Sequence, residues 1–368
     1  MTTTSTTDPT TGPTTTPPHG PPQGLDDLLA RFVGDLGATV AAGNVVLGDR
    51  LGLYRALAGA GPLTSSELAA RTATSERYVR EWLRGQAAGG AVSYREDSDR
   101  YWMTPEQVLA FADPDGLVLP GAFQLAVACL ADLPAITEAF RTGGGVAWGD
   151  HHPDVFTGCE RFFRPSYAAN LVSSWIPAIA GLGERLASGA AVADVGCGLG
   201  ASTRILADAY PASRVVGFDS HPASIELARS ITAEAGLADR CTFRLARAQE
   251  FPGTGYGLVT TFDCLHDMGD PTSAARRVRS ALAPDGVWMV VEPYAGASVA
   301  ENLTPVGRVY YSFSSFLCVP HAVSEGAADA LGNQAGEGAV ARVAERAGFG
   351  HVARVAETPF NIVYEVRP

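Results

Sequence analysis

The sequence predicts an α/β protein with a doubly wound, seven-stranded sheet, preceded by a helical domain and closed by a helical cap. From about residue 189 onward, short apolar runs alternate with helical patterns, which is typical of a parallel sheet covered by helices. One of these runs is followed by three alternating glycines, and the next run ends in an acid. The first half of the chain instead carries apolar residues at helical spacing.

Length, charge and cysteine usage exclude several classes of protein. The 368 residues are enough for two domains, the net charge is −12, and the 27 basic residues are all arginine. Nucleic-acid binding requires a basic face, so this balance argues against it. The six cysteines form no C-x-x-C pair, no apolar run reaches spanning length, and no signal-peptide pattern opens the chain. We therefore expect reduced thiols, a cytoplasmic location and no membrane partner.

The N-terminal third predicts a tail followed by a winged helix. Residues 1–24 are almost all Thr, Pro, Gly and Ser, a composition that predicts disorder. Helices are expected after residue 25, from about Leu47, after the capping box Thr64-Ser65-Ser66-Glu67, and around Trp82. Two short strands then flank a polar tip at residues 96–99. Residues 25–105 therefore predict a winged-helix domain.

Two functions compete for this winged helix: reading DNA in a ligand-sensing regulator, or dimerisation and covering of a substrate. Between Pro62 and Met103, six arginines stand against six acidic residues, so no basic recognition face is expected. The second function is therefore favoured. An apolar stripe in the first helix predicts a homodimer: Leu25, Leu28, Leu29, Phe32, Val33 and Leu36.

Residues 106–188 are predicted to be a helical linker, and residues 294–338 a cap inserted after the fifth strand. Aromatic residues in both segments are candidates for an apolar substrate wall, although they fit an inter-domain core equally well: Trp148, Phe163, Tyr167, Trp175, Tyr310 and Phe316. The adjacent His151 and His152 diverge on one element and have no evident third ligand, so no metal site is expected there or elsewhere.

Residues 189–368 are predicted to form the doubly wound domain. The expected parallel strands cover residues 192–195, 215–219, 241–246, 258–262 and 287–292, with a turn at Pro284-Asp285-Gly286 before the last. Residues 351–357 and 360–366 are expected to form a closing antiparallel pair. The glycine loop and Asp219 then meet at the carboxyl edge of the sheet, where Asp219 is placed to accept hydrogen bonds from a ribose diol.

The loop differs from the dinucleotide fingerprint G-x-G-x-x-G. It reads Asp194-x-Gly196-x-Gly198-x-Gly200, which resembles motif I of the class I S-adenosylmethionine-dependent methyltransferases. An acid in the strand suits a cofactor that carries an ammonium and a sulfonium group but no phosphate. The fold that this resemblance implies is Rossmann-like.

The resemblance extends to bacterial small-molecule methyltransferases with an N-terminal winged helix, through the run Thr260-Thr261-Phe262-Asp263-Cys264-Leu265-His266-Asp267-Met268-Gly269-Asp270-Pro271. It implies that the glycines approach the methionine part of S-adenosylmethionine, and that Phe262 and Asp263 lie near its sulfur. Arg247 stands where the family commonly has an acid for adenine, so that contact is expected from Gln249 or backbone; Gly257 replaces another usual acid. Asp194, Ser220 and Ala248 complete the expected cofactor site.

The catalytic candidates are His266 and Asp267. His266 corresponds to the base of small-molecule O-methyltransferases, where a neutral imidazole would accept a proton, but it also suits a structural anchor of the loop. Asp267 is expected to point away from the ring and to cap the following helix. The expected function is methyl transfer to a hydroxyl of a small secondary metabolite; transfer to nitrogen, carbon or sulfur, and a non-catalytic regulator, remain alternatives.

Overall fold

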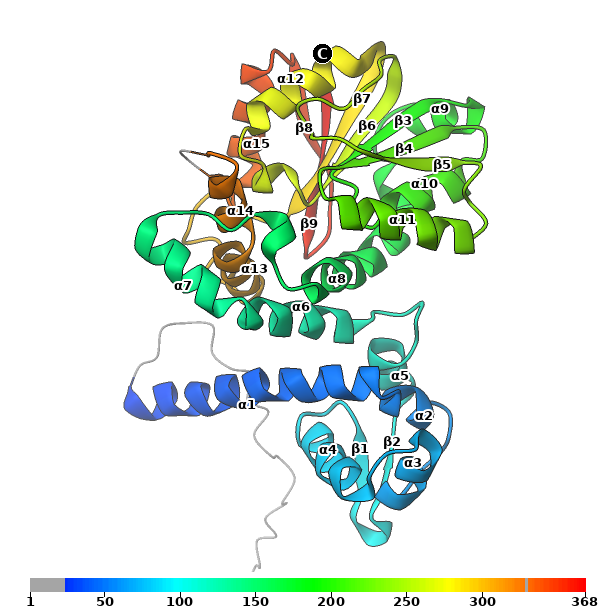
Figure 1. Cartoon of the computed structure of the whole chain (residues 1–368), viewed down its shortest axis with the longest axis vertical. Coiled ribbons are helices and arrows are strands. Elements are labelled where there is room, and N and C mark those ends of the chain that lie inside the picture. The colour runs from blue at the N-terminus through cyan, green and yellow to red at the C-terminus, as the bar shows by residue number, and fades with distance from the viewer. Residues whose placement is uncertain (1–23, 328–329) are drawn as a thin grey trace, which may run out of the picture. The chain divides into compact units, whose positions relative to one another are not determined.

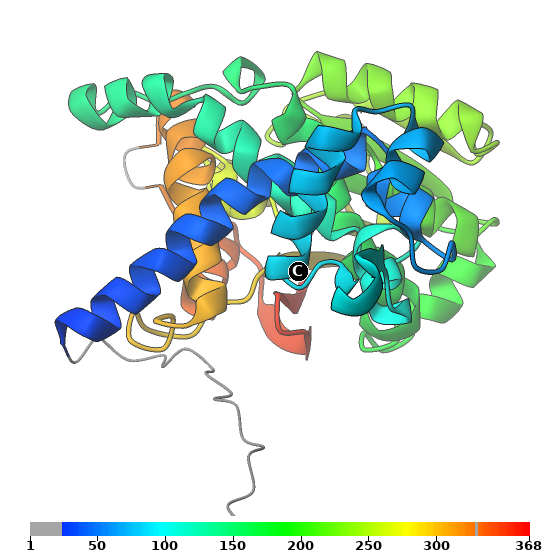
Figure 2. The same cartoon turned by 90° about the horizontal axis from the view of Figure 1, so that it is seen from below.

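The structure, a computed structural model, describes residues 24–327 and 330–368. The tail predicted to be disordered therefore lies outside the described residues, apart from Gly24. The chain divides into two compact units, Met1–Val40 and Ala41–Pro368. Helix α1 (Leu25–Arg50), the long blue ribbon of Figures 1 and 2, runs across this boundary.

The winged-helix pattern is present, with one difference at its start. Its elements are α2 (Leu53–Leu57), α3 (Ser65–Thr72), α4 (Glu76–Ala88), β1 (Ser93–Arg95), η1 (Glu96–Ser98) and β2 (Arg100–Trp102). The capping box between Thr64 and Glu67 is formed as predicted. Leu47 belongs to α1 rather than to a second helix, because no proline interrupts residues 25–50 and the chain first turns at Gly52, whose φ is 69°.

The linker is helical, as predicted. It consists of α5 (Pro105–Phe111), α6 (Leu119–Ala131), α7 (Leu133–Thr142), η2 (Trp148–Asp150), α8 (Asp154–Asn170), the π-helical turn η3 (Leu171–Trp175) and α9 (Leu182–Ser188). Over the described ranges, no single helix is long and apolar enough to cross a membrane; α6 and α7 pass that test only as a pair bent by 57°.

The predicted seven-stranded sheet is present (Figure 1). Its strands are β3 (Ala191–Val195), β4 (Arg214–Asp219), β5 (Cys241–Leu245), β6 (Tyr256–Phe262), β7 (Leu282–Pro293), β8 (His351–Glu357) and β9 (Asn361–Arg367). They lie in the order β5-β4-β3-β6-β7-β9-β8, and only β9 runs antiparallel to its two neighbours. Strand β7 begins at Leu282, five residues before the predicted Val287. The predicted turn at residues 284–286 lies within this strand, where the pairing with β6 shifts register between Tyr256 and Leu258.

Helices cover both faces of the sheet because side chains alternate along each strand. On β7, Met289 and Val291 face the core formed with α9, α10 (Ala201–Ala209) and α11 (Pro222–Glu234). Trp288 and Val290 face the opposite core, formed with α12 (Pro271–Ala281) and α15 (Gly336–Arg346). The predicted cap contains α13 (Pro305–Phe316) and α14 (Cys318–Ser324).

Candidate cofactor and active site

A cavity opens at the carboxyl edge of the sheet, beside the point where the strand order reverses between β3 and β6. Ligands of doubly wound sheets bind at such a point. The cavity is lined by the loops that follow β3, β4, β5 and β6, and by residues of α8, α13 and α14. Most of the predicted site residues meet here: Trp148, Phe163, Tyr167, Gly196, Gly198, Asp219, Ser220, Ala248, Gln249, Phe262, Asp263, His266, Asp267 and Tyr310.

Two predicted wall residues lie elsewhere. Trp175 is fully buried in the sheet core, where its ring packs against Phe262 and Tyr167. Phe316 does not line the cavity; it packs beside Ile136 and against the apolar cluster that contains Leu125. On α13, the side chains of Tyr310 and Phe313 line the cavity. Phe316, six residues after Tyr310, faces another side of the helix.

Two predicted cofactor residues support the glycine loop from outside the cavity. The carboxylate of Asp194 accepts hydrogen bonds from the hydroxyls of Ser202, Thr203 and Thr260 at 2.6–2.8 Å, and is fully buried. It therefore ties β3 to α10 and β6 rather than facing a ligand. Gly200 is the N-cap residue just before α10, and a Cβ there would lie 2.4 Å from the ring of Phe243.

The glycine loop and Asp219 fit the sugar and methionine parts of S-adenosylmethionine. Gly198 has a φ of 51°, and a Cβ built there would enter open space, so glycine leaves room beside the loop. One Asp219 oxygen accepts from the Gly198 amide and the other from the His221 amide, each at 2.8 Å. A carboxylate oxygen accepts more than one hydrogen bond, so both keep capacity for a diol. Burial raises the pKa of Asp219, while the two amide bonds oppose that rise.

The residues expected to contact adenine line the cavity beside an ion pair. Arg247, Ala248 and Gln249 all line the cavity, and the Arg247 guanidinium lies 3.0 Å from the carboxylate of Glu325, which follows α14. The Gln249 amide donates to the Asp270 carbonyl at 3.4 Å. The expectation that Gln249 or backbone contacts adenine stays a prediction.

Asp263 adopts an unusual backbone conformation directly after β6. Its φ is 48°, a left-handed geometry that is uncommon outside glycine, asparagine and aspartate. Its carboxylate accepts from the Tyr167 hydroxyl at 2.6 Å and from the Asn361 amide at 2.8 Å. Burial raises the pKa of Asp263 to about 8, although the Tyr167 hydrogen bond opposes that rise.

His266 lies between two carboxylates and is buried. Its Nδ1 is 2.5 Å from Glu292 Oε2, and its Nε2 is 3.0 Å from Asp267 Oδ1. The other Glu292 oxygen accepts from the Leu265 amide at 3.0 Å. Burial lowers the pKa of His266, but the charges of Asp267 and Glu292 outweigh it and hold that pKa well above its usual value.

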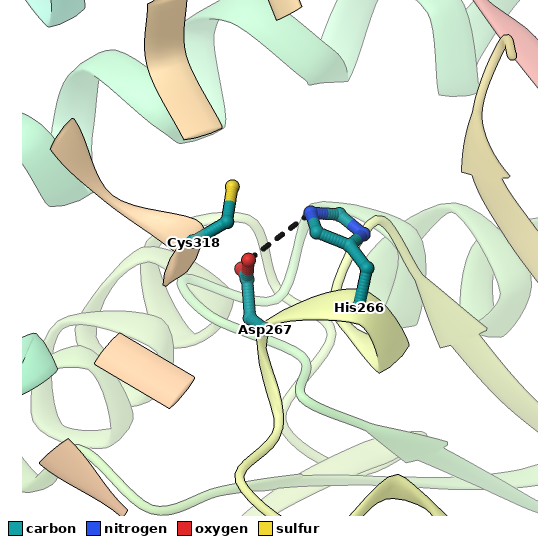
Figure 3. Close-up of side chains that lie close together, drawn as sticks. All are labelled: His266, Asp267 and Cys318. Carbon is teal, nitrogen blue, oxygen red and sulfur yellow. Dashed lines mark ion pairs between the residues drawn. The ribbon is translucent and has the colours of Figure 1, made fainter. Parts of the chain in front are cut away.

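One expectation about this histidine needs correction. Asp267 faces the imidazole (Figure 3), and the following helix is capped by Asp270, which accepts from the Ser273 amide. The two flanking carboxylates raise the pKa of the ring, and proton acceptance by a neutral imidazole stays a prediction. Sequence reasoning missed Glu292, although the signal was an acid at the end of a buried strand.

The adjacent histidines of the linker, His151 and His152, both contact Asp132. His151 Nδ1 lies 2.8 Å from Asp132, which also accepts from the His152 amide. The group of metal-ligating side chains that the described residues do bring together is at the cavity instead: His266, Asp267 and Cys318.

Family comparisons agree with the fold. The family described as "Methyltransferase domain" matches residues 186–348, and the "Rv2258c-like winged HTH domain" matches residues 39–112. The chain therefore carries an S-adenosylmethionine-dependent methyltransferase domain of the class I type after an N-terminal winged helix, and its cofactor is S-adenosylmethionine.

Individual relatives are similar over different parts of the chain. Mitomycin biosynthesis 6-O-methyltransferase of Streptomyces lavendulae is 28% identical over 243 residues, covering 63% of this chain and 68% of that protein. A probable chloroplastic tocopherol O-methyltransferase of Oryza sativa subsp. japonica is 32% identical over 102 residues, which span 27% of this chain and only 28% of the rice protein. The structure of human N-acetylserotonin methyltransferase with S-adenosylmethionine superposes with a TM-score of 0.68 at 16% identity, covering 92% and 98% of the two chains.

Proposed function

We propose that this enzyme transfers the methyl group of S-adenosylmethionine to a hydroxyl of a small, aromatic secondary metabolite. One observation carries the proposal: a single cavity joins the glycine loop and Asp219 to an aromatic wall, with His266 and its two carboxylates beside it. When bound, the cofactor supplies an electrophilic methyl group on a sulfonium, which leaves as a neutral thioether. The names of the two relatives, both O-methyltransferases, support oxygen as the acceptor atom.

The wall of the cavity favours a flat, apolar acceptor. Its aromatic side chains include Phe162 and Phe163 on α8 and Phe313 on α13. The Phe162 and Phe313 rings lie 6.1 Å apart between centroids, within the range of aromatic pairing. An acceptor ring would add to these contacts, so its hydroxyl is positioned by stacking rather than by many hydrogen bonds.

The His266 cluster is the proposed proton acceptor. With the Nδ1 proton donated to Glu292, the imidazole keeps a lone pair on Nε2. It can therefore take a proton from an acceptor hydroxyl, and the three groups titrate together rather than singly. Glu292 holds the Nδ1 side of the ring, which directs Nε2 toward Asp267.

Cofactor binding is tested by calorimetry with S-adenosylmethionine. Asp219→Ala removes a carboxylate and should weaken binding about 10- to 150-fold, the equivalent of about 1.5–3 kcal/mol for charge-assisted hydrogen bonds. Asp219→Asn is the gentler variant, since it keeps one acceptor oxygen for the amides. Asp208→Ala removes a largely exposed acid on α10 and serves as the control. Equal affinities for all four proteins would refute the assigned role of Asp219.

The acceptor atom is tested with isotope-labelled methyl. Phenolic compounds that raise the melting temperature in the presence of S-adenosylhomocysteine are incubated with methyl-labelled cofactor, and NMR of the product locates the label. A label on a phenolic oxygen supports the proposal. A label found only on nitrogen, carbon or sulfur would refute it in favour of another methyl transfer.

A further inference from the structure

Three metal-ligating side chains from two separate elements meet at one side of the cavity. His266 and Asp267 lie on the turn η4 (Leu265–Asp267), and Cys318 is the first residue of α14. The imidazole nitrogen, carboxylate oxygen and thiol sulfur all lie within 4.8 Å of one another. Figure 3 shows the three side chains turned toward a common point, and all three line the cavity.

The electrostatics of this cluster favour a cation. Asp267 Oδ1 is buried without a hydrogen-bond partner, although it lies 3.0 Å from His266 Nε2. Glu292 faces the other side of the imidazole, so two carboxylates flank one ring. The neighbouring Arg247 is instead engaged by Glu325. A bound cation would interact favourably with both carboxylates.

We propose that His266, Asp267 and Cys318 form a binding site for a zinc-like divalent metal ion, whose occupancy blocks the methyl transfer proposed above. A nitrogen, an oxygen and a thiolate sulfur suit Zn²⁺, whereas Mg²⁺ and Ca²⁺ prefer oxygen ligands alone. Three protein ligands leave a fourth position open toward the cavity, where water would bind. Glu292 holds the ring from its Nδ1 side, as carboxylates commonly do behind metal-bound histidines.

The metal ion would block methyl transfer because it binds Nε2 of His266, the same atom that would accept the proton of the acceptor hydroxyl. This part of the inference rests on the proposed function. Metal binding forms bonds to Nε2, to a carboxylate oxygen and to the Cys318 thiolate, and releases the thiol proton and any Nε2 proton to solvent. The lone pair of Nε2 is then held by the metal. The metal-loaded cluster therefore no longer accepts a proton from an acceptor hydroxyl.

Binding is measured without any enzymatic reaction. The full-length protein is treated with a chelator, dialysed and titrated with Co²⁺, a spectroscopic substitute for Zn²⁺. We expect one equivalent to give tetrahedral visible bands and a thiolate-to-cobalt charge-transfer band, both removed by added Zn²⁺. Cys318→Ser should abolish the charge-transfer band and weaken binding about 100-fold or more, and Glu292→Gln should weaken it about 10- to 100-fold. Cys241→Ser, at a buried thiol on β5, is the matched control and should leave the spectrum unchanged.

Inhibition is measured as a ratio within each protein, so that differences in basal rate cancel. Zn²⁺ should lower the initial rate of methyl transfer with the same concentration dependence as its binding, and the ratio of rates with and without Zn²⁺ should approach one in Cys318→Ser. If Cys318→Ser does not fold, as judged by circular dichroism, Asp267→Asn replaces it. It should weaken Co²⁺ binding while retaining the charge-transfer band.

Several outcomes overturn the inference. Absence of a cobalt spectrum, or a charge-transfer band that persists in Cys318→Ser, shows that these side chains form no metal site. Stimulation by Zn²⁺ refutes blocking. If the protein transfers methyl groups but binds no Co²⁺, the metal site is refuted and the proposed function stands. If it binds Co²⁺ but methylates no acceptor, the proposed function is refuted and the metal site stands.

Discussion

Glu292→Gln tests whether the orientation of His266 drives methyl transfer. Glu292 is 6% exposed, accepts from the Leu265 amide through one oxygen, and holds His266 Nδ1 at 2.5 Å through the other. Glutamine has nearly the same shape, so its amide oxygen keeps the bond to Leu265. Its NH₂ group, however, then faces Nδ1 and needs the lone pair of that nitrogen. The imidazole proton moves to Nε2, the nitrogen on the side of the cavity.

The expected loss follows from that change of tautomer. A ring protonated at Nε2 accepts no proton there, so the contribution of the base, about 10²- to 10⁴-fold in kcat, is lost. Glu292 does not line the cavity, so affinity for S-adenosylmethionine should stay within about twofold of wild type. Single-turnover kinetics and calorimetry measure the two quantities.

Glu138→Gln, at an exposed acid on α7, is the control and should change neither quantity. A Glu292→Gln enzyme whose kcat stays near that of wild type would refute the reasoning. In that case alignment of the acceptor alone would account for the rate, and nitrogen, sulfur or an already acidic phenol would be the better assignment of the acceptor.

Three further predictions concern stability and assembly. The pKa of Asp263 is raised to about 8 in the fold, against 3.8 for an ordinary aspartate. Its protonated form therefore stabilises the native state, and this stabilisation is lost as pH rises from about 4 through 8. The free energy of unfolding of Asp263→Asn, measured with denaturant, should depend less on pH over this range. Phe32→Asp should convert a sedimenting dimer into a monomer, since the apolar stripe of α1 is at least half exposed; a monomeric wild type would contradict this. The winged helix should bind DNA no tighter than about micromolar at physiological salt in gel shifts, because its charges cancel.

The order of the elements could be predicted from the sequence because local signals agree with the tertiary fold. The capping box at Thr64 forms from residues three apart in the chain, and the strand that ends in Asp219 is buried as its apolar run requires. The break between α1 and α2 was misplaced because Leu47 fits the periodicity of both helices. Only the turn at Gly52 separates them.

The composition of the site was harder to predict, because it depends on which way a side chain points. Tyr167 and Trp175 are both aromatic and lie one segment apart, yet only Tyr167 lines the cavity while Trp175 fills the core beneath it. Glu292 and Cys318 meet the loop of His266 across 26 and 52 residues of sequence. No local sequence pattern predicts such a contact.

Three acids at the edge of the sheet account for the proposed position of the base. Asp219, Asp263 and Glu292 each end or directly follow a parallel strand, so the sheet brings three carboxylates to one edge. Backbone amides hold Asp219, and a phenol and an amide hold Asp263. Glu292 is held by an amide and by an imidazole. Among these donors, the imidazole is the group whose ordinary pKa lies near neutrality, so proton transfer is assigned to the end of β7 and binding to the end of β4.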